Sequence, residues 1–204
     1  MTTIITTQQP KENTIPLSNE KPAPLDRTEP KKDMSGIEVV YDPKLMGNEN
    51  TNGVLMGLNI SAYGKGHVLT RRIAIGGGAG VSYGIGQLTF DSDVKARLQQ
   101  AVVDGFFLFN INSVNEDVAV ELRTGLGVAL GFDKASQIRF DSPVGFSFRP
   151  NIKVAVDYRI KECRQGDLFV TVGGQFFGDI PENDNVTPMV GGGLFVGIKY
   201  TQEN

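Results

Sequence analysis

A strict two-residue alternation of side-chain type over residues 117–132 constrains this chain more than any other feature. One set of alternate positions is mostly aliphatic, namely Val118, Val120, Leu122, Thr124, Leu126, Val128, Leu130 and Phe132. The intervening positions are small or charged, namely Ala119, Glu121, Arg123, Gly125, Gly127, Ala129 and Gly131. Successive side chains of a strand point to opposite faces, whereas a helix would scatter both sets around its circumference, so the pattern predicts a β-strand.

The same alternation recurs through the chain after residue 52, and residues typical of turns separate the segments, as at 64–66 and 149–151. Residues 91–103 differ, because Ser92 or Asp93 can cap a helix whose apolar residues follow helical spacing. We therefore predict an all-β fold, an eight-stranded antiparallel up-and-down β-barrel with one short helix. The predicted strands are 53–64, 69–88, 104–113, 117–132, 136–148, 151–161, 167–178 and 188–200.

The first 50 residues have a different composition, with six of the ten prolines but only two of the 25 glycines. Their scattered hydrophobic residues bury too little apolar area to offset the entropy of ordering, which predicts a disordered N-terminal arm. We therefore expect two regions, an arm over 1–50 and a β-barrel domain over 51–204. The arm has no apolar run of the kind that a secretory leader requires, and no transmembrane helix is expected anywhere in the sequence.

Alternation alone does not show which face meets water, and three details favour lipid on the aliphatic face. Glycines crowd the polar face, which weakens an exposed strand but suits the narrow interior of an eight-stranded barrel. Several aromatic residues of the aliphatic face, such as Tyr158, Phe176 and Tyr200, are expected near strand ends, as in interfacial girdles. Charges of both signs share the polar face and could pair in a lumen; this predicted charge network is Glu121, Arg123, Lys153, Asp157, Arg159 and Lys199.

With eight alternating strands, a glycine-lined charged face and the last segment VGGGLFVGIKY, residues 53–200 resemble the small OmpA/OmpX-type, porin-like outer-membrane barrels. The chain departs from that family in its continuation after Tyr200 and in its lack of tryptophan. The resemblance implies an outer-membrane protein with a structural, anchoring or interaction role. The lipid bilayer would be its main partner, and the arm or the loops would reach a protein partner.

The composition excludes several function classes. A single histidine and a single cysteine provide neither a multi-histidine metal site nor a disulfide framework, and a net charge of −3 argues against nucleic-acid binding. The run Gly76–Gly80 lacks the Lys-Ser/Thr of a phosphate-binding loop. We therefore expect no catalytic residue, no cofactor and no metal site. His67 with Ser61 or Ser82 would be the candidate hydrolase pair, but the spacing does not support it, and the acidic loop Asp179–Asp184 lacks the EF-hand spacing of a calcium site.

These observations predict a non-enzymatic outer-membrane β-barrel. The main alternative is a soluble β-barrel or sandwich that binds an apolar ligand or serves as an assembly subunit. A barrel-type lipid hydrolase built around His67 is a third hypothesis.

Overall fold

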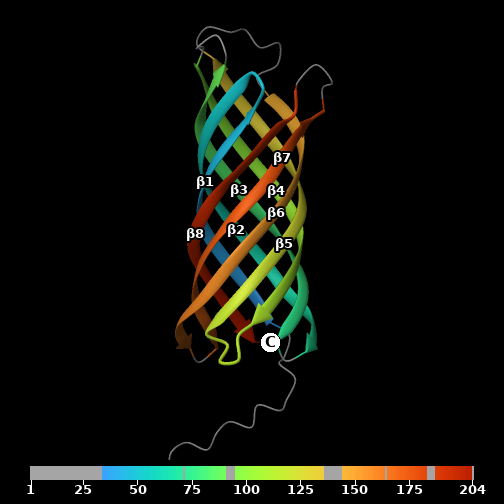
Figure 1. Cartoon of the computed structure of the whole chain (residues 1–204), viewed down its shortest axis with the longest axis vertical. Helices are drawn as coiled ribbons and strands as arrows, with labels where there is room; N and C mark the ends of the chain where they lie inside the picture. The colour runs from blue at the N-terminus through green and yellow to red at the C-terminus, as the bar shows by residue number, and fades with distance from the viewer. Residues whose placement is uncertain are drawn as a thin grey trace, which may run out of the picture.

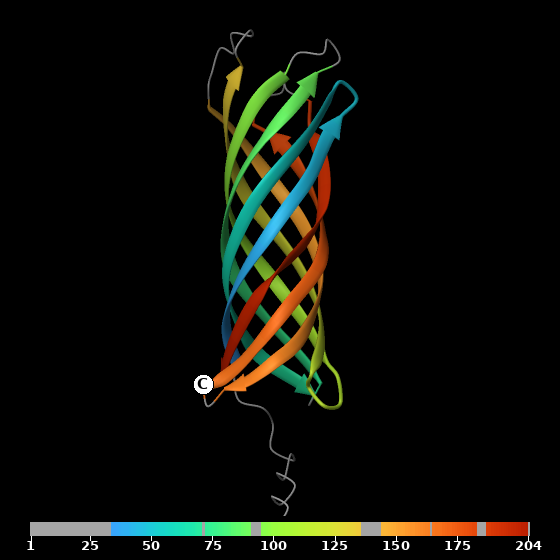
Figure 2. The same cartoon turned by 90° about the vertical axis from the view of Figure 1, so that its left-hand side faces the viewer.

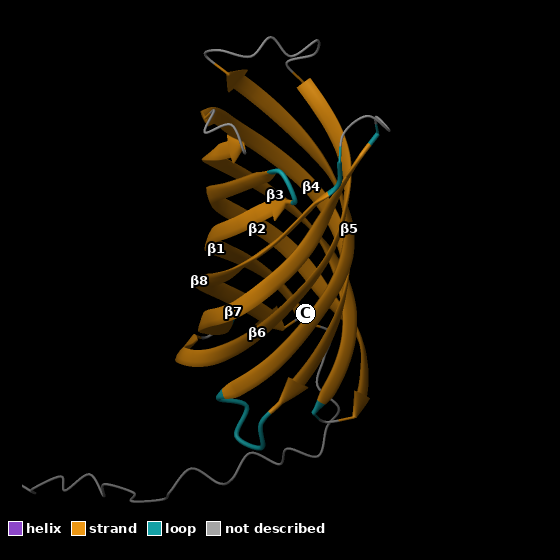
Figure 3. Cartoon of the chain, turned by 45° about the horizontal axis from the view of Figure 1, so that its top comes forward, coloured by secondary structure: helices purple, strands orange, loops and turns teal. Residues whose placement is uncertain are grey.

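The protein is a closed barrel of eight antiparallel strands (Figure 1). The computed structural model describes residues 34–70, 72–90, 95–135, 144–163, 165–182 and 187–203. No helix able to cross a membrane occurs among these residues, and Figure 3 draws them as strands with a few loops and turns. The strands are β1 (Met34–Asn48), β2 (Thr51–Thr70), β3 (Ile73–Phe90), β4 (Lys95–Asn112), β5 (Val118–Ala135), β6 (Val144–Cys163), β7 (Gly166–Pro181) and β8 (Met189–Glu203).

Every strand pairs with its sequence neighbours, and β1 pairs with β8 to close the barrel. The strands are long and tilted, as a closed sheet requires (Figures 1 and 2). The β1–β8 register runs from Met34↔Glu203 to Tyr41↔Val196 and resumes unshifted at Leu45↔Gly192. Pro43 lies in this interruption and has no N–H group to donate to a ladder.

The two ends of the barrel differ in their connections. Met34 and Glu203 lie at the end that is drawn at the bottom of Figures 1 and 2, here called the lower end. The lower connections between strands are short, covering residues 71–72, 113–117 and 164–165. At the upper end, the connections 136–143 and 182–188 are the longest of the barrel.

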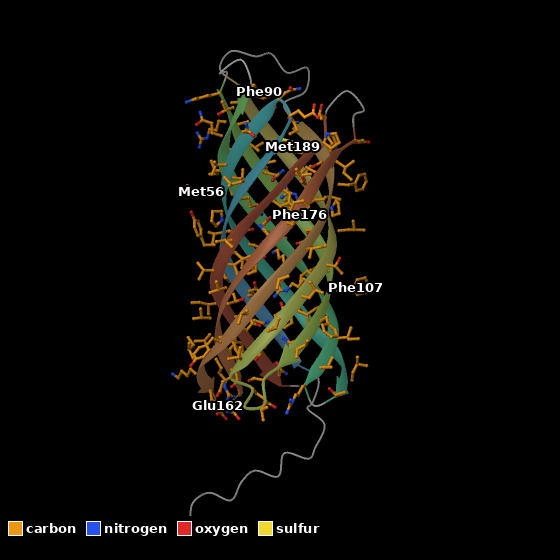
Figure 4. The ribbon with its side chains drawn as sticks, in the orientation of Figure 1. Met56, Phe90, Phe107, Glu162, Phe176 and Met189 are labelled. Atoms are coloured by element: carbon orange, nitrogen blue, oxygen red, sulfur yellow. The ribbon has the colours of Figure 1, made fainter. Side chains whose placement is uncertain are left out.

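The aliphatic face of the strands is the outer face of the barrel, and the charged face lines the lumen. On β5, Leu126 and Val128 are exposed, whereas Glu121 and Arg123 are buried inside. Figure 4 shows side chains projecting from the wall along its whole height. A soluble barrel has the opposite arrangement, with apolar residues inside and polar residues outside.

The predicted arm extends too far. Residues 34–48, which were assigned to it, form β1 and pair with both β2 and β8. The alternation is present, because Ile37, Val39 and Tyr41 face outward while Glu38 and Asp42 are buried. Pro43 and the inward charged residues give this strand the composition of a polar tail, so its two-residue alternation was not recognised. The boundary at residue 50 is therefore wrong, and residues 1–33 lie outside the described part of the chain.

The predicted helix is also wrong for residues 95–103, which belong to β4; residues 91–94 are not described. Good helix formers fill this segment, but β3 and β5 supply ladder partners on both sides, as in Leu98↔Gly86 and Leu98↔Asp133. The inward and outward positions also alternate, with Leu98 and Val102 buried and Val103 exposed. Tertiary pairing overrides local propensity here.

Two predicted turns lie inside strands. Residues 64–66 belong to β2, which has a register irregularity between Gly64 and His67. Residues 149–151 belong to β6, so the predicted strands 136–148 and 151–161 correspond to one strand over 144–163. Pro150 pairs with Leu126 on the β5 side, while the β7 ladder omits residues 149–150 without changing register. The predicted number of strands is right because this division offsets the missed β1.

Candidate functional site

The most distinctive site is a group of buried ion pairs across the lumen, here called the central network: Glu38, Glu121, Arg123, Asp157 and Lys199. Arg123 on β5 donates from Nε to Glu121 and from Nη2 to Glu38 on β1. Its Nη1 donates to Ser61 Oγ on β2 at 3.1 Å. All five network residues are buried, so each charge depends on its partner rather than on water.

Lys199 on β8 completes the central network. Its ammonium lies 2.5 Å from Glu121 Oε2 and 2.5 Å from Asp157 Oδ2 on β6. Glu121 therefore contacts two cations, and the network links β1, β5, β6 and β8 through side chains. These buried ion pairs connect strands that share no ladder, such as β5 and β8.

A second group of polar side chains lies nearer the upper end, here called the upper network: Gln100, Arg149 and Asp179. Arg149 Nε donates to Asp179 Oδ1 at 2.6 Å, and Arg149 Nη2 donates to Gln100 Oε1 at 2.7 Å. Gln100 Nε2 donates to Asp179 Oδ2 at 3.2 Å, which closes the triangle. A further ion pair joins Lys44 Nζ to Asp42 Oδ2 at 2.9 Å.

Aromatic rings pack against the buried cations. Arg149 lies 4.2 Å from the Phe177 ring centroid, and Arg123 lies 4.9 Å from that of Phe106. These distances are in the range of favourable cation–π contacts. The Phe106 ring fits because Gly78 faces it from β3, where a Cβ atom would lie 2.7 Å from Phe106 Cζ. Glycine on the inner face thus makes room for rings in a narrow lumen.

Apolar side chains fill the lumen between these polar groups. Phe177 packs in a buried cluster at the upper part of the barrel with Met46, Leu55, Leu88 and Leu98. An interior cavity below it has a volume of about 20 Å³, which is room for about one water molecule. Its lining includes Lys44, Asp104, Arg149 and Lys153. The described side chains therefore leave no wide channel at this level.

The structure brings together four of the six residues of the predicted charge network: Glu121, Arg123, Asp157 and Lys199. Lys153 also points inward, but its Nζ lies 5.8 Å from the Phe195 ring centroid rather than in the central network. Arg159 lies apart near the lower end, where it pairs with Asp117 at 2.5 Å and Asp167 at 3.6 Å.

Sequence reasoning missed several lumen residues. Glu38, Asp42 and Lys44 were hidden in the predicted arm, although each occupies an alternate position between hydrophobic residues. Arg149 was placed in a turn, and Asp179 was placed in an acidic loop. Extending the two-residue alternation through Pro43 and Pro150 would have identified Glu38, Asp42, Lys44 and Arg149 as inward positions. Asp179 would have needed the predicted strand 167–178 to continue by one residue.

The alternative chemical sites lack suitable geometry. Ser61 is buried and bound by Arg123, and it lies six residues from His67 along β2, roughly 20 Å for an extended strand. Ser82 pairs with Asn59, which is further still from His67. Asp179 points inward to Arg149, while Asp184 is not described. The described residues contain no group of three or more potential metal ligands.

No protein-family model and no curated protein matches the chain. Among solved structures it is similar to the outer membrane enzyme PagL, with a TM-score of 0.55 and 13% identity over 84% of this chain and 99% of that chain. It is also similar to Ail, the attachment invasion locus protein of Yersinia pestis, in complex with the heparin analogue sucrose octasulfate. Here the TM-score is 0.51 and the identity 10%, over 83% of this chain and 99% of that chain. The chain thus has the fold of the small eight-stranded outer-membrane barrels that its residues resemble.

Proposed function

We propose that this protein is an outer-membrane β-barrel that acts without catalysis, in a structural, anchoring or interaction role. The apolar outer wall supports the membrane placement, because residues such as Leu126, Phe107 and Leu194 are exposed over more than two thirds of their surface. A hydrocarbon environment would cover these side chains, and the closed ladder leaves no sheet edge in lipid.

The filled lumen is the observation that carries the anchoring role. The central network, the upper network and the apolar cluster around Phe177 occupy successive levels of the barrel interior. A pore needs a continuous aqueous path, whereas buried charged, polar and hydrophobic side chains occupy this interior. The barrel is therefore better suited to hold connected segments at a membrane than to conduct solutes.

The connections suggest an orientation for this anchor. Outer-membrane barrels have short periplasmic turns and longer external loops. The lower end, with the three short connections and both ends of the described barrel, would then face the periplasm. Met34 and Glu203 would then lie on the periplasmic side, and the strand ends Ala135, Val144, Pro181 and Met189 on the external side.

A hydrolase remains the competing function, because PagL is an outer membrane enzyme of similar fold. In this chain the pairing of His67 with Ser61 or Ser82 is not supported, since both serines lie far along the wall from His67. The soluble alternative conflicts with the outward aliphatic face.

Reconstitution tests the proposal. We expect the purified protein to require detergent to remain monodisperse and to insert into phospholipid vesicles. In planar bilayers it should add no steady conductance, because the lumen is filled. A protein that stays monodisperse in plain buffer would contradict the membrane placement, and stable single-channel steps would replace the anchoring role with a pore.

A further inference from the structure

The upper part of the β7–β8 hairpin, here called the hairpin tip, consists of residues 178–181 of β7 and 189–192 of β8. Figure 4 shows Met189, the first residue of β8, in the upper part of the barrel. The ladder between β7 and β8 is continuous through the tip. The ladders that attach these two strands to β6 and to β1 are both interrupted, either in the tip or just below it.

A proline lies in each interruption. The β6–β7 ladder omits residues 149–150, which include Pro150, and the β1–β8 ladder omits residues 42–44, which include Pro43. Proline has no N–H group to donate, so it removes a hydrogen bond wherever it stands inside a sheet. Beyond the interruptions, toward the upper end, two pairs remain on the β6 side and three on the β1 side. The hairpin tip is therefore attached to its neighbours by short stretches of ladder.

A buried ion pair crosses the β6–β7 interruption. Arg149 and Asp179 occupy opposite positions of the unshifted register there, and Arg149 Nε donates to Asp179 Oδ1 at 2.6 Å. Gln100 on β4 bonds to both residues from across the lumen. Hydrogen bonds between charged groups are stronger than neutral ones, so this ion pair attaches the tip at the point where the backbone ladder does not.

We propose that the hairpin tip opens as a unit while the rest of the barrel stays folded, and that the Arg149–Asp179 ion pair controls this opening. Segments with few attachments to the rest of a protein open locally at low cost in free energy. Opening would expose the upper network to water at the upper end of the barrel, whereas the ion pairs of the central network, which join β1, β5, β6 and β8, would stay closed. A small molecule could then reach the upper lumen although no pore exists.

Hydrogen–deuterium exchange of the protein in dodecyl maltoside micelles, measured by mass spectrometry of proteolytic peptides, tests the opening. We expect peptides that contain the hairpin tip to exchange at least about tenfold faster than peptides from residues 85–90 and 95–100. These reference residues form the upper ends of β3 and β4, where the ladders with both neighbouring strands are continuous. The two regions therefore differ in the interruption of their ladders rather than in their place along the barrel.

Two substitutions should change the exchange of the tip in opposite directions. Asp179→Asn removes the charge that binds Arg149 and should speed this exchange by roughly another tenfold. Pro150→Val should slow it, because the β5–β6 ladder is continuous at this exposed position and the restored N–H group would face β7. The matched control is Asp167→Asn, the same chemical change at the lower end of β7, where Asp167 lies 3.6 Å from Arg159. It should leave the tip unchanged.

Equal exchange rates in the hairpin tip and in the reference peptides would overturn the independent opening. If Asp179→Asn changed no peptide, or accelerated all peptides alike, the ion pair would not control the tip. A Pro150→Val protein whose tip exchanged as fast as that of the parent would overturn the role of the interrupted ladder. None of these results depends on the proposed function, because vesicle insertion and conductance are measured separately on the same proteins.

Discussion

The ammonium nitrogen of Lys199 on β8 lies 2.5 Å from Glu121 Oε2 on β5, so this ion pair spans the lumen between strands that share no ladder. Asp157 on β6 contacts the same ammonium. Because both carboxylates are buried, removal of the lysine would leave two negative charges in the lumen with one fewer cation. The pairing therefore couples distant strands more strongly than a surface salt bridge could.

We expect Lys199→Met to lower the free energy of unfolding by about 3–5 kcal/mol, as for other broken buried ion pairs. Urea titration of the protein in vesicles, followed by far-UV circular dichroism, measures this change. Lys161→Met is the control, since Lys161 is exposed near the lower end of β6 and its loss should change stability by less than about 0.5 kcal/mol. Equal effects of the two substitutions would show that the central network does not stabilise the barrel.

Gly78→Val should destabilise the barrel by about 1–3 kcal/mol through overpacking. A Cβ at Gly78 would clash with the backbone oxygen of Ala62, and it would lie 2.7 Å from Phe106 Cζ and 2.8 Å from Tyr63 Cβ. Gly105→Val is the matched control on the outer face of β4, where valine has room and suits a strand. The same urea titration compares them. A Gly78→Val protein as stable as the control would mean that the β2 backbone and the rings adjust at no cost.

The sequence alone predicted a strand correctly wherever that strand showed an uninterrupted two-residue alternation. In β5 the alternation from Val118 to Leu130 is uninterrupted, so the strand and its two faces follow from the residues alone. The prediction missed β1 because Pro43 and three inward charged residues give this segment the composition of a polar tail. Its alternation becomes convincing only beside its ladders with β2 and β8, and β8 lies at the other end of the sequence.

Long-range contacts limited the prediction of the site further. Arg123 and Glu38 are 85 residues apart, so their pairing depends on the closure of the barrel and its register. Alternation places Arg123 in the lumen but does not select its partners. This pairing has no local sequence signal.

The correction at β1 has a simple test by proteolysis. Lys44 is buried and β1 is paired on both sides, so trypsin should cleave after Lys44 slowly in the folded protein. Mass spectrometry should therefore find Lys44 within the protected fragment, whereas urea-unfolded protein should be cut there readily. Rapid cleavage after Lys44 with an otherwise intact barrel would restore the predicted boundary near residue 50.

The orientation of the two faces is tested by Val128→Arg. Val128 is 44% exposed on the outer face of β5, and a charge near the bilayer midplane would cost about 2–4 kcal/mol. We expect a reduced folded fraction in phospholipid vesicles, measured by the mobility of unheated samples in SDS gels, and a smaller loss in detergent micelles, which can deform around the charge. Val114→Arg is the control, because Val114 is 67% exposed in the β4–β5 turn, outside the strands. It should fold as well as the parent. If Val128→Arg were instead tolerated in vesicles as well as Val114→Arg, the outer wall would not lie in hydrocarbon and the membrane placement would fail.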